Sequence, residues 1–162
     1  MPKDQDPDRP LSTQGQSDIQ RLAGRLAEYL AGGGPSGDMG VGCILHSDKL
    51  RAEQTARIIA DSLESSVSVE SCSGISPNDN AAAFVEERNL EQCSSQGKGQ
   101  QMDGDAGSTM IVSHMPFVSN LCSTLLTGST EVEFDFTPGT LVCLFYEYEE
   151  WSMEYMVRPE FY

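Results

Sequence analysis

The sequence predicts an α/β fold in which helices cover both faces of a mainly parallel β-sheet, giving a three-layer α/β/α sandwich. Two segments of the same kind support this prediction. Residues 41–45 read as a buried parallel strand, and an amphipathic helix pattern follows over 49–63. A second apolar run, 109–112, leads to His114, and Pro116 then stands where the first turn of a helix would begin. Each segment is therefore a strand followed by a helix.

The remaining elements extend this βα organisation. Ser12 is placed to cap a helix that runs to about Leu30. That helix carries its apolar side chains on one face, and these are Ile19, Leu22, Leu26, Tyr29 and Leu30. In chain order we further expect a Gly-rich loop over 31–40, a short strand over 67–70, a turn over 76–79 that starts a helix through Val85, a polar loop over 93–108, a helix over 116–126, and a hairpin of 140–146 with 152–157.

Length and composition indicate one small intracellular domain. The 162 residues suit a single domain, and no run of 18 apolar residues or signal-like start is present. We therefore expect a cytoplasmic protein with no membrane association. The five cysteines form no Cys-x-x-Cys pair, so neither a disulfide framework nor a metal site is expected. The net charge of −15 argues against a nucleic-acid partner, which requires a basic face.

Both predicted strands end near a histidine, at the place where α/β proteins bind ligands. His46 ends the first strand, and His114 precedes the N-terminus of a helix, whose free amides and dipole favour an anion such as phosphate. Arg51 falls in the first turn of the other helix, where a cation is locally unfavourable unless it binds an anion. The alternative to an anion site is that Arg51 is a solvated surface residue paired with Asp48 or Glu53. In that case each histidine only makes a hydrogen bond to the loop that follows it.

Several segments resemble one known family. Residues 47–56 resemble the second arginine motif of the histidine phosphatase superfamily, and residues 112–117 resemble its second histidine motif. Residues 9–15 resemble the segment that opens the first helix in SixA-type phosphohistidine phosphatases. Residues 136–141 and Trp151 also fit that branch. These segments occur in the family's order and cover nearly the whole chain.

The resemblance implies a phosphoglycerate mutase-like fold and a covalent mechanism. In that mechanism a histidine attacks phosphorus, and water then hydrolyses the phosphohistidine. The resemblance makes Arg51 the second arginine and His114 the second histidine, both catalytic and both phosphate-binding, because they spread positive charge over the phosphate oxygens. Arg9 is expected to border the phosphate-binding pocket. No cofactor is implied.

The chain departs from the family at the Arg-His-Gly motif, which ends the family's first strand and holds the nucleophile. Its only histidines are His46 and His114, and neither stands in such a motif. Met1 stands about where the motif would have ended, so we expect residues 1–162 to be a single domain, truncated at the N-terminus, with the first strand missing. Three accounts are open: a start set roughly ten residues too late, a degenerate homologue, or His46 as a replacement nucleophile. As given, the chain is expected to be inactive.

Together these observations favour a phosphohistidine phosphatase, a hydrolase of signal transduction. Its expected partner is a phosphorylated protein such as a histidine phosphotransfer domain, with inorganic phosphate as the product. A protein substrate is favoured because the chain lacks a long insertion that would roof the site. One alternative is a catalytically inactive homologue that binds phosphorylated partners. Another is a small-molecule phosphomonoesterase or mutase.

Overall fold

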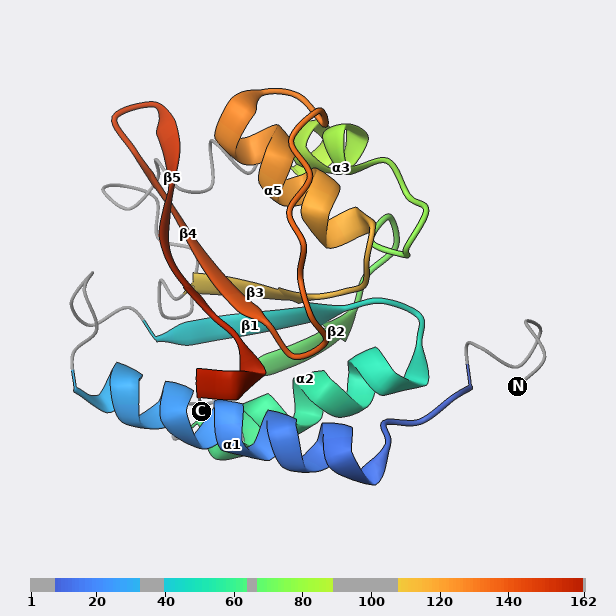
Figure 1. Ribbon diagram of the computed structural model, residues 1–162, viewed down its shortest axis with the longest axis vertical. Helices are drawn as coiled ribbons and strands as arrows, with labels where there is room; N and C mark the ends of the chain where they lie inside the picture. Colours follow the sequence, from blue (N-terminus) through green and yellow to red (C-terminus); the bar gives the residue numbers. More distant parts are fainter. Residues whose placement is uncertain (1–7, 33–39, 64–66, 89–107, 162) are drawn as a thin grey trace. The chain divides into compact units, whose positions relative to one another are not determined.

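A computed structural model describes residues 8–32, 40–63, 67–88 and 108–161 (Figure 1). The chain divides into two compact units, and each is described by itself. Unit 1 comprises residues 1–73 and 105–113 with the last residue, and unit 2 comprises 74–104 and 114–161. Most of the expected loops over 31–40 and 93–108, with Cys93, lies outside the described residues.

Unit 1 is built on a parallel three-stranded sheet. Its strands are β1 (Val41–His46), β2 (Ser68–Ser71) and β3 (Ser108–Val112), in the order β2-β1-β3. Leu45 of β1 is in register with Glu70 of β2 on one side and with Ile111 of β3 on the other. This confirms the predicted parallel sheet and the α/β fold class.

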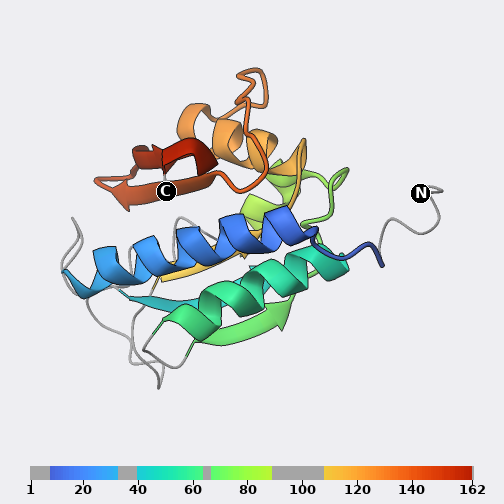
Figure 2. The same cartoon turned by 60° about the horizontal axis from the view of Figure 1, so that its bottom comes forward.

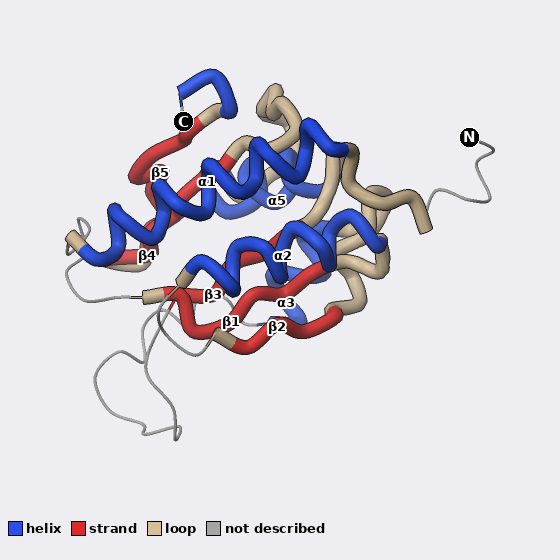
Figure 3. Tube along the Cα trace, turned by 90° about the horizontal axis from the view of Figure 1, so that it is seen from below, coloured by secondary structure: helices blue, strands red, loops and turns tan. Residues whose placement is uncertain are grey.

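Two helices complete unit 1. Helix α2 (Leu50–Ser62) packs against all three strands, and α1 (Thr13–Ala31) lies beside α2 (Figures 2 and 3). Both helices bury small or aliphatic side chains: Ile19, Leu22, Ala23 and Leu26 of α1, and Ala52, Ala56 and Ile59 of α2. Tyr29 differs from the prediction, because it is 40% exposed on the last turn of α1.

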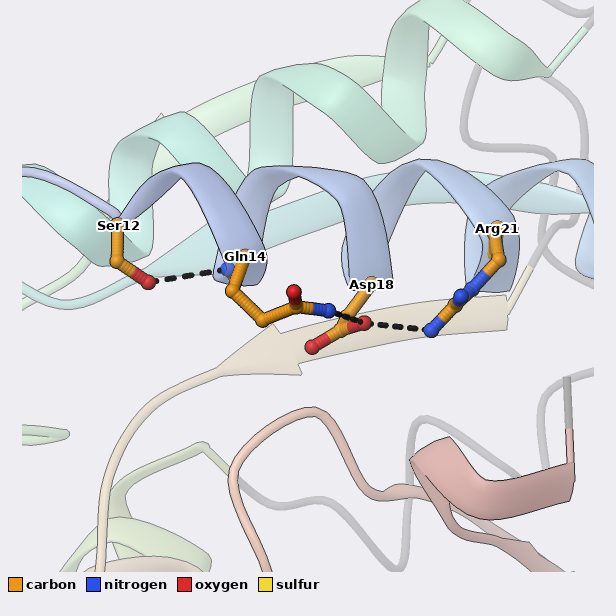
Figure 4. Close-up of polar contacts among 5 residues, drawn as sticks. Ser12, Gln14, Asp18 and Arg21 are labelled. Atoms are coloured by element: carbon orange, nitrogen blue, oxygen red, sulfur yellow. Dashed lines mark hydrogen bonds and ion pairs between the residues drawn. The ribbon is translucent and has the colours of Figure 1, made fainter.

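The start of α1 is fixed by side-chain hydrogen bonds (Figure 4). Ser12 is the N-cap, and its hydroxyl accepts a bond of 3.0 Å from the amide of Gly15. One turn further, the carboxylate of Asp18 accepts from Gln14 and pairs with Arg21. The predicted cap at Ser12 is thus confirmed, and the helix runs one residue beyond the predicted end.

Strand β3 is less buried than its sequence predicts. Its first two residues are exposed and the last three, Met110–Val112, are half-buried. The physical reason is pairing: among the described residues β3 has a partner on one side, β1, and none on the other. An apolar strand at a sheet edge keeps part of its surface uncovered.

Unit 2 combines two helices with an antiparallel hairpin. Helix α3 (Ala81–Arg88) packs against α5 (Phe117–Thr127), and Phe84 meets the fully buried Phe117 edge to face, 5.8 Å between ring centroids. Strand β4 (Leu141–Glu147) pairs with β5 (Glu150–Val157), which contacts α5, and a short 3-10 helix, η2 (Pro159–Phe161), follows. The predicted helices and hairpin are confirmed to within a few residues.

The turn of the hairpin consists of Tyr148 and Glu149. Both have positive φ values, 55° and 66°. Two-residue hairpins favour turns with left-handed backbone at both positions, but Asn-Gly is the usual pair. The Tyr-Glu pair therefore holds a conformation that suits neither residue.

An extended segment of unit 2, residues 131–136, lies along α5 and is called the strap below. The amide of Val132 donates to the hydroxyl of Ser123 at 3.1 Å, and the amide of Phe134 donates to that of Ser119 at 2.8 Å. Ser123 and Ser119 are buried. Alternate amides of the strap thus bind hydroxyls on successive turns of the helix.

Candidate functional site

The carboxyl end of β1 holds His46 in a fixed position. The backbone is bonded on both sides, because the carbonyl of His46 accepts from the amide of Cys72 at 2.9 Å and the amide of Ser47 donates to the carbonyl of Val112 at 3.2 Å. The imidazole is 8% exposed, and its Nδ1 lies 2.8 Å from the carbonyl oxygen of Ser47. A carbonyl oxygen only accepts, so Nδ1 carries the proton and Nε2 of the neutral ring carries none.

Arg51 lies in the first turn of α2, as predicted. The N-cap of this helix is Lys49, which makes no capping hydrogen bond from its side chain. Of the two acids considered as partners for Arg51, Glu53 pairs with Arg57 at 2.8 Å. The other, Asp48, has its carboxylate 3.9 Å from the ammonium of Lys49, and both Asp48 and Arg51 take part in further interactions. The Arg51 side chain is half-buried, and its carbonyl accepts from Thr55 at 2.8 Å.

Arg9 belongs to a segment that is fastened to α2. The amide of Leu11 donates a 2.8 Å hydrogen bond to Oε1 of Gln54, which lies three residues beyond Arg51 on the same helix face. Arg9 itself is exposed. The Leu11–Gln54 bond therefore connects the segment carrying Arg9 to the first turns of α2.

His114 belongs to unit 2 and lies two residues beyond the end of β3, so it follows the strand rather than ending it. It is half-buried, and its carbonyl accepts from the amide of Val118 at 3.1 Å. Pro116 is the N-cap of α5 rather than its first helical residue, and the Met115–Pro116 peptide bond is cis. The predicted placement of His114 just before a helix N-terminus is confirmed.

Of the candidate site residues, unit 1 contains Arg9, His46 and Arg51, whereas unit 2 contains His114. Sequence reasoning missed two contacts. The bond from His46 to its neighbouring carbonyl has no sequence signature, because any residue supplies a carbonyl. The hydrogen bond from Leu11 to Gln54 has only a weak sequence signature, since a glutamine on an amphipathic helix does not show which backbone amide it binds.

The cysteines of the described residues are free thiols: Cys43, Cys72, Cys122 and Cys143. Burial raises the pKa of Cys122 to about 11, and burial together with the nearby carboxylate of Glu154 raises the pKa of Cys143. Both thiols therefore stay protonated near neutral pH and are poor nucleophiles. Across the described ranges, no three His, Cys, Asp or Glu side chains gather in a way that could hold a metal ion.

Comparison with known proteins identifies the fold. No family model matches the chain, and no curated protein matches it by sequence. Among solved structures, the protein histidine phosphatase SixA complexed with tungstate aligns with a TM-score of 0.73 and 23% identity, over 95% of this chain and 86% of that one. A protein named as the phosphohistidine phosphatase SixA of Agrobacterium tumefaciens aligns with a TM-score of 0.69 and 16% identity, over 98% and 89%.

A more distant structure extends the comparison beyond SixA. The mycobacterial glucosyl-3-phosphoglycerate phosphatase in complex with VO3 aligns with a TM-score of 0.58 and 15% identity, over 91% of this chain and 87% of that one. The chain thus has the phosphoglycerate mutase-like fold that these phosphatase structures share. Within that fold, the alignments to the two SixA structures have higher TM-scores than the alignment to the glucosyl-3-phosphoglycerate phosphatase. No helix among the described residues is long and apolar enough to span a membrane.

Proposed function

We propose that this protein acts on phosphoryl groups carried by another protein, as a phosphohistidine phosphatase of the SixA type. The observation that carries the proposal is the position of Arg51, a half-buried arginine in the first turn of α2, within a fold shared with a SixA structure that holds tungstate. Tungstate is a tetrahedral oxyanion like phosphate, and guanidinium binds two oxygens of such an anion at once.

In this proposal Arg51 and His114 are the phosphate ligands and Arg9 borders the site. Their positive charge stabilises the phosphoryl oxygens as the bond to phosphorus changes. The partner is a phosphorylated protein, such as a histidine phosphotransfer domain in signal transduction, and inorganic phosphate is the product. The protein works in the cytoplasm. Residues 1–162 act as one domain in this role.

Turnover requires a nucleophile, and the Arg-His-Gly histidine of the family is not among the chain's two histidines. We therefore expect this chain to bind phosphate and to turn over substrate poorly. The alternative to the phosphatase is an inactive homologue that binds phosphorylated partners without turning them over. A form with an added strand ending in Arg-His-Gly ahead of residue 1 is expected to hydrolyse a phosphohistidine protein far faster than the chain itself.

The binding step is tested by titrating inorganic phosphate into the protein and following backbone amide NMR signals. Arg51→Ala and His114→Ala are each expected to weaken binding at least about tenfold, the scale of losing one charge-assisted contact. Arg57→Ala is the matched control, because Arg57 lies on the same helix, exposed and paired with Glu53. Equal phosphate affinity in Arg51→Ala and Arg57→Ala would remove Arg51 from the site.

A further inference from the structure

The two edges of the sheet in unit 1 differ in their sequence. Strand β2 forms one edge with four residues, of which Ser68, Glu70 and Ser71 are exposed. Strand β3 forms the other edge among the described residues, and its sequence Ser-Thr-Met-Ile-Val holds no charge and no proline. Short length, charges and prolines are features that keep a sheet edge from pairing with another chain. The β2 edge therefore has this protection, whereas the β3 edge lacks charge and proline.

Two residues of β3 turn their backbone groups away from the sheet. The amide of Ser108 and the carbonyl of Val112 hydrogen-bond to the residues just before and just after β1, at 2.8 Å and 3.2 Å, so both residues face β1. The amide and carbonyl of one strand residue point to the same side, and this side alternates along the strand. Thr109 and Ile111 therefore point away from β1, where the described residues offer their backbone groups no partner.

The β3 edge leads to the end of the sheet where we place the phosphate site. Val112 is the last residue of β3 and is in register with His46, the last residue of β1. Ligands of open parallel sheets bind outside these carboxyl ends. Helix α2, which carries Arg51 in its first turn, begins at the same end of β1. A chain that pairs in parallel with β3 and continues past Val112 would therefore bring its next side chains to this end of the sheet.

We propose that the β3 edge binds the phosphorylated partner as an added parallel strand, so that the protein recognises a phosphohistidine that follows an extended segment. The proposal rests on the proposed function, because it takes the phosphate site to lie at this end of the sheet. Backbone hydrogen bonds to Thr109 and Ile111 hold the segment, and its alternate side chains contact the apolar residues of the strand. The parallel direction is the one that β1 and β3 already share.

The charge of the chain favours a partner segment over a second copy of the chain. A net charge of −15 makes two copies repel each other, whereas a segment flanked by lysine or arginine is attracted. The size of the edge favours the same occupant, because β3 has five residues. A strand pair of this length buries less than the about 1,200 Å² of a stable protein–protein interface. A short extended segment needs only the edge itself.

The probe is a fluorescently labelled synthetic peptide, Lys-Thr-Val-Thr-Val-Thr-His, used before and after phosphorylation of its histidine with potassium phosphoramidate. With the full 162-residue chain, fluorescence anisotropy is expected to show binding of both forms. The phosphorylated form should bind about tenfold or more tightly, and Arg51→Ala should remove this difference. A peptide of reversed sequence carries the phosphohistidine at the opposite end and should lack the gain. In hydrogen exchange of the wild-type protein, the bound peptide should protect the amides of Thr109 and Ile111.

Variants then test which edge binds the peptide. Ile111→Pro removes an outward amide of β3 and is expected to weaken peptide binding about tenfold or more. Val69→Pro is the matched control. The amide of Cys72 donates to the carbonyl of His46, so by the same alternation the amide of Val69 points outward from the β2 edge. This control should leave peptide binding unchanged. Methylating the backbone amides of the peptide tests the same contact without changing the protein, even where a variant folds poorly.

Several results would overturn the proposal. These are equal effects of the two proline changes, no protection of Thr109 and Ile111 by the bound peptide, and equal affinity for the two forms of the peptide. Self-association of the free chain in sedimentation that Ile111→Pro abolishes would also overturn it, because the occupant would then be a second copy. The phosphate titration keeps the two levels apart. Phosphate binding without peptide binding overturns only the docking edge, whereas absence of phosphate binding overturns the proposed function.

Discussion

The backbone amide of Leu11 donates a 2.8 Å hydrogen bond to the side-chain oxygen of Gln54, a residue 43 positions further along the chain. This single bond ties the segment before α1 to the helix that carries Arg51. A segment outside helices and strands has no regular backbone hydrogen bonds to hold it, so one long-range hydrogen bond of this kind fixes its position. The position of Arg9 relative to α2 therefore depends on Gln54.

Gln54→Leu is expected to free the segment before α1. The change leaves the Leu11 amide without its acceptor and lowers the free energy of unfolding by about 1 kcal/mol. Hydrogen exchange at the Leu11 amide should accelerate, and urea unfolding measures the loss of stability. Gln54→Glu keeps a side-chain oxygen and should preserve the slow exchange. Gln14→Leu, which removes only an exposed bond to Asp18, is the second control.

Ser119→Ala is expected to destabilise the strap. It removes the acceptor of the Phe134 amide from a buried position, at a cost of about 1–3 kcal/mol in urea unfolding. Thr124→Val is a control on the same helix, because Thr124 Oγ1 is buried and has no hydrogen-bond partner among the described residues. Removing that hydroxyl should be neutral or stabilising. A Thr124→Val variant as unstable as Ser119→Ala would contradict the argument.

The hairpin turn offers a stabilising change. Replacing Tyr148 and Glu149 by Asn and Gly matches the positive φ values at both positions and is expected to stabilise the protein by about 1 kcal/mol or more. Thermal unfolding measures the gain as a higher midpoint. Tyr148→Thr tests the same reasoning in the opposite direction, since a β-branched residue tolerates positive φ poorly and should lower the midpoint.

Cys122 is expected to make stability fall at high pH. Burial raises its pKa from 9.0 to about 11, so the folded protein holds the thiol proton more tightly than the unfolded chain does. The stability contributed by this difference is fully present below about pH 9 and is lost as the pH rises through about 11. Unfolding free energies measured at pH 8 and pH 11 should differ more in the wild type than in Cys122→Ala, by about 1–2 kcal/mol. Equal pH dependence in both proteins would contradict this assignment.

Local patterns predicted the helices and strands of the described residues well, because periodicity and caps act over a few residues. Ser12 marked the start of α1, and the apolar run before His46 marked β1. Burial was predicted less well, since it depends on distant partners. Tyr29 is exposed on the last turn of α1, and β3 is half-buried because its pairing among the described residues is one-sided.

The candidate site was predicted as residue types rather than as contacts. Arg51 stands in the first turn of α2 and His114 just before α5, as the spacing of each from its strand indicated. The anchor of His46 could not be predicted, because it is made by a backbone carbonyl. Similarly, the sequence does not show that the hydroxyls of Ser119 and Ser123 accept hydrogen bonds from a segment further along the chain.

The pairing between α5 and the strap fixes the length of the connection between them. The two bonded serines of α5 are four residues apart, which is a rise of about 6 Å along the helix. The two bonded amides of the strap are two residues apart, which is about 6.6 Å of extended chain. These two lengths match, so both hydrogen bonds form together. The same twofold repeat agrees with the packing of Phe134 and Phe136, which are half-buried and stacked with 5.8 Å between ring centroids, whereas Glu133 and Asp135 are exposed. Inserting one residue after Ser129 would exchange the two sides and turn Glu133 and Asp135 toward the surface now taken by the aromatic rings. Homologues that keep these two serines should therefore vary this connection by even numbers of residues.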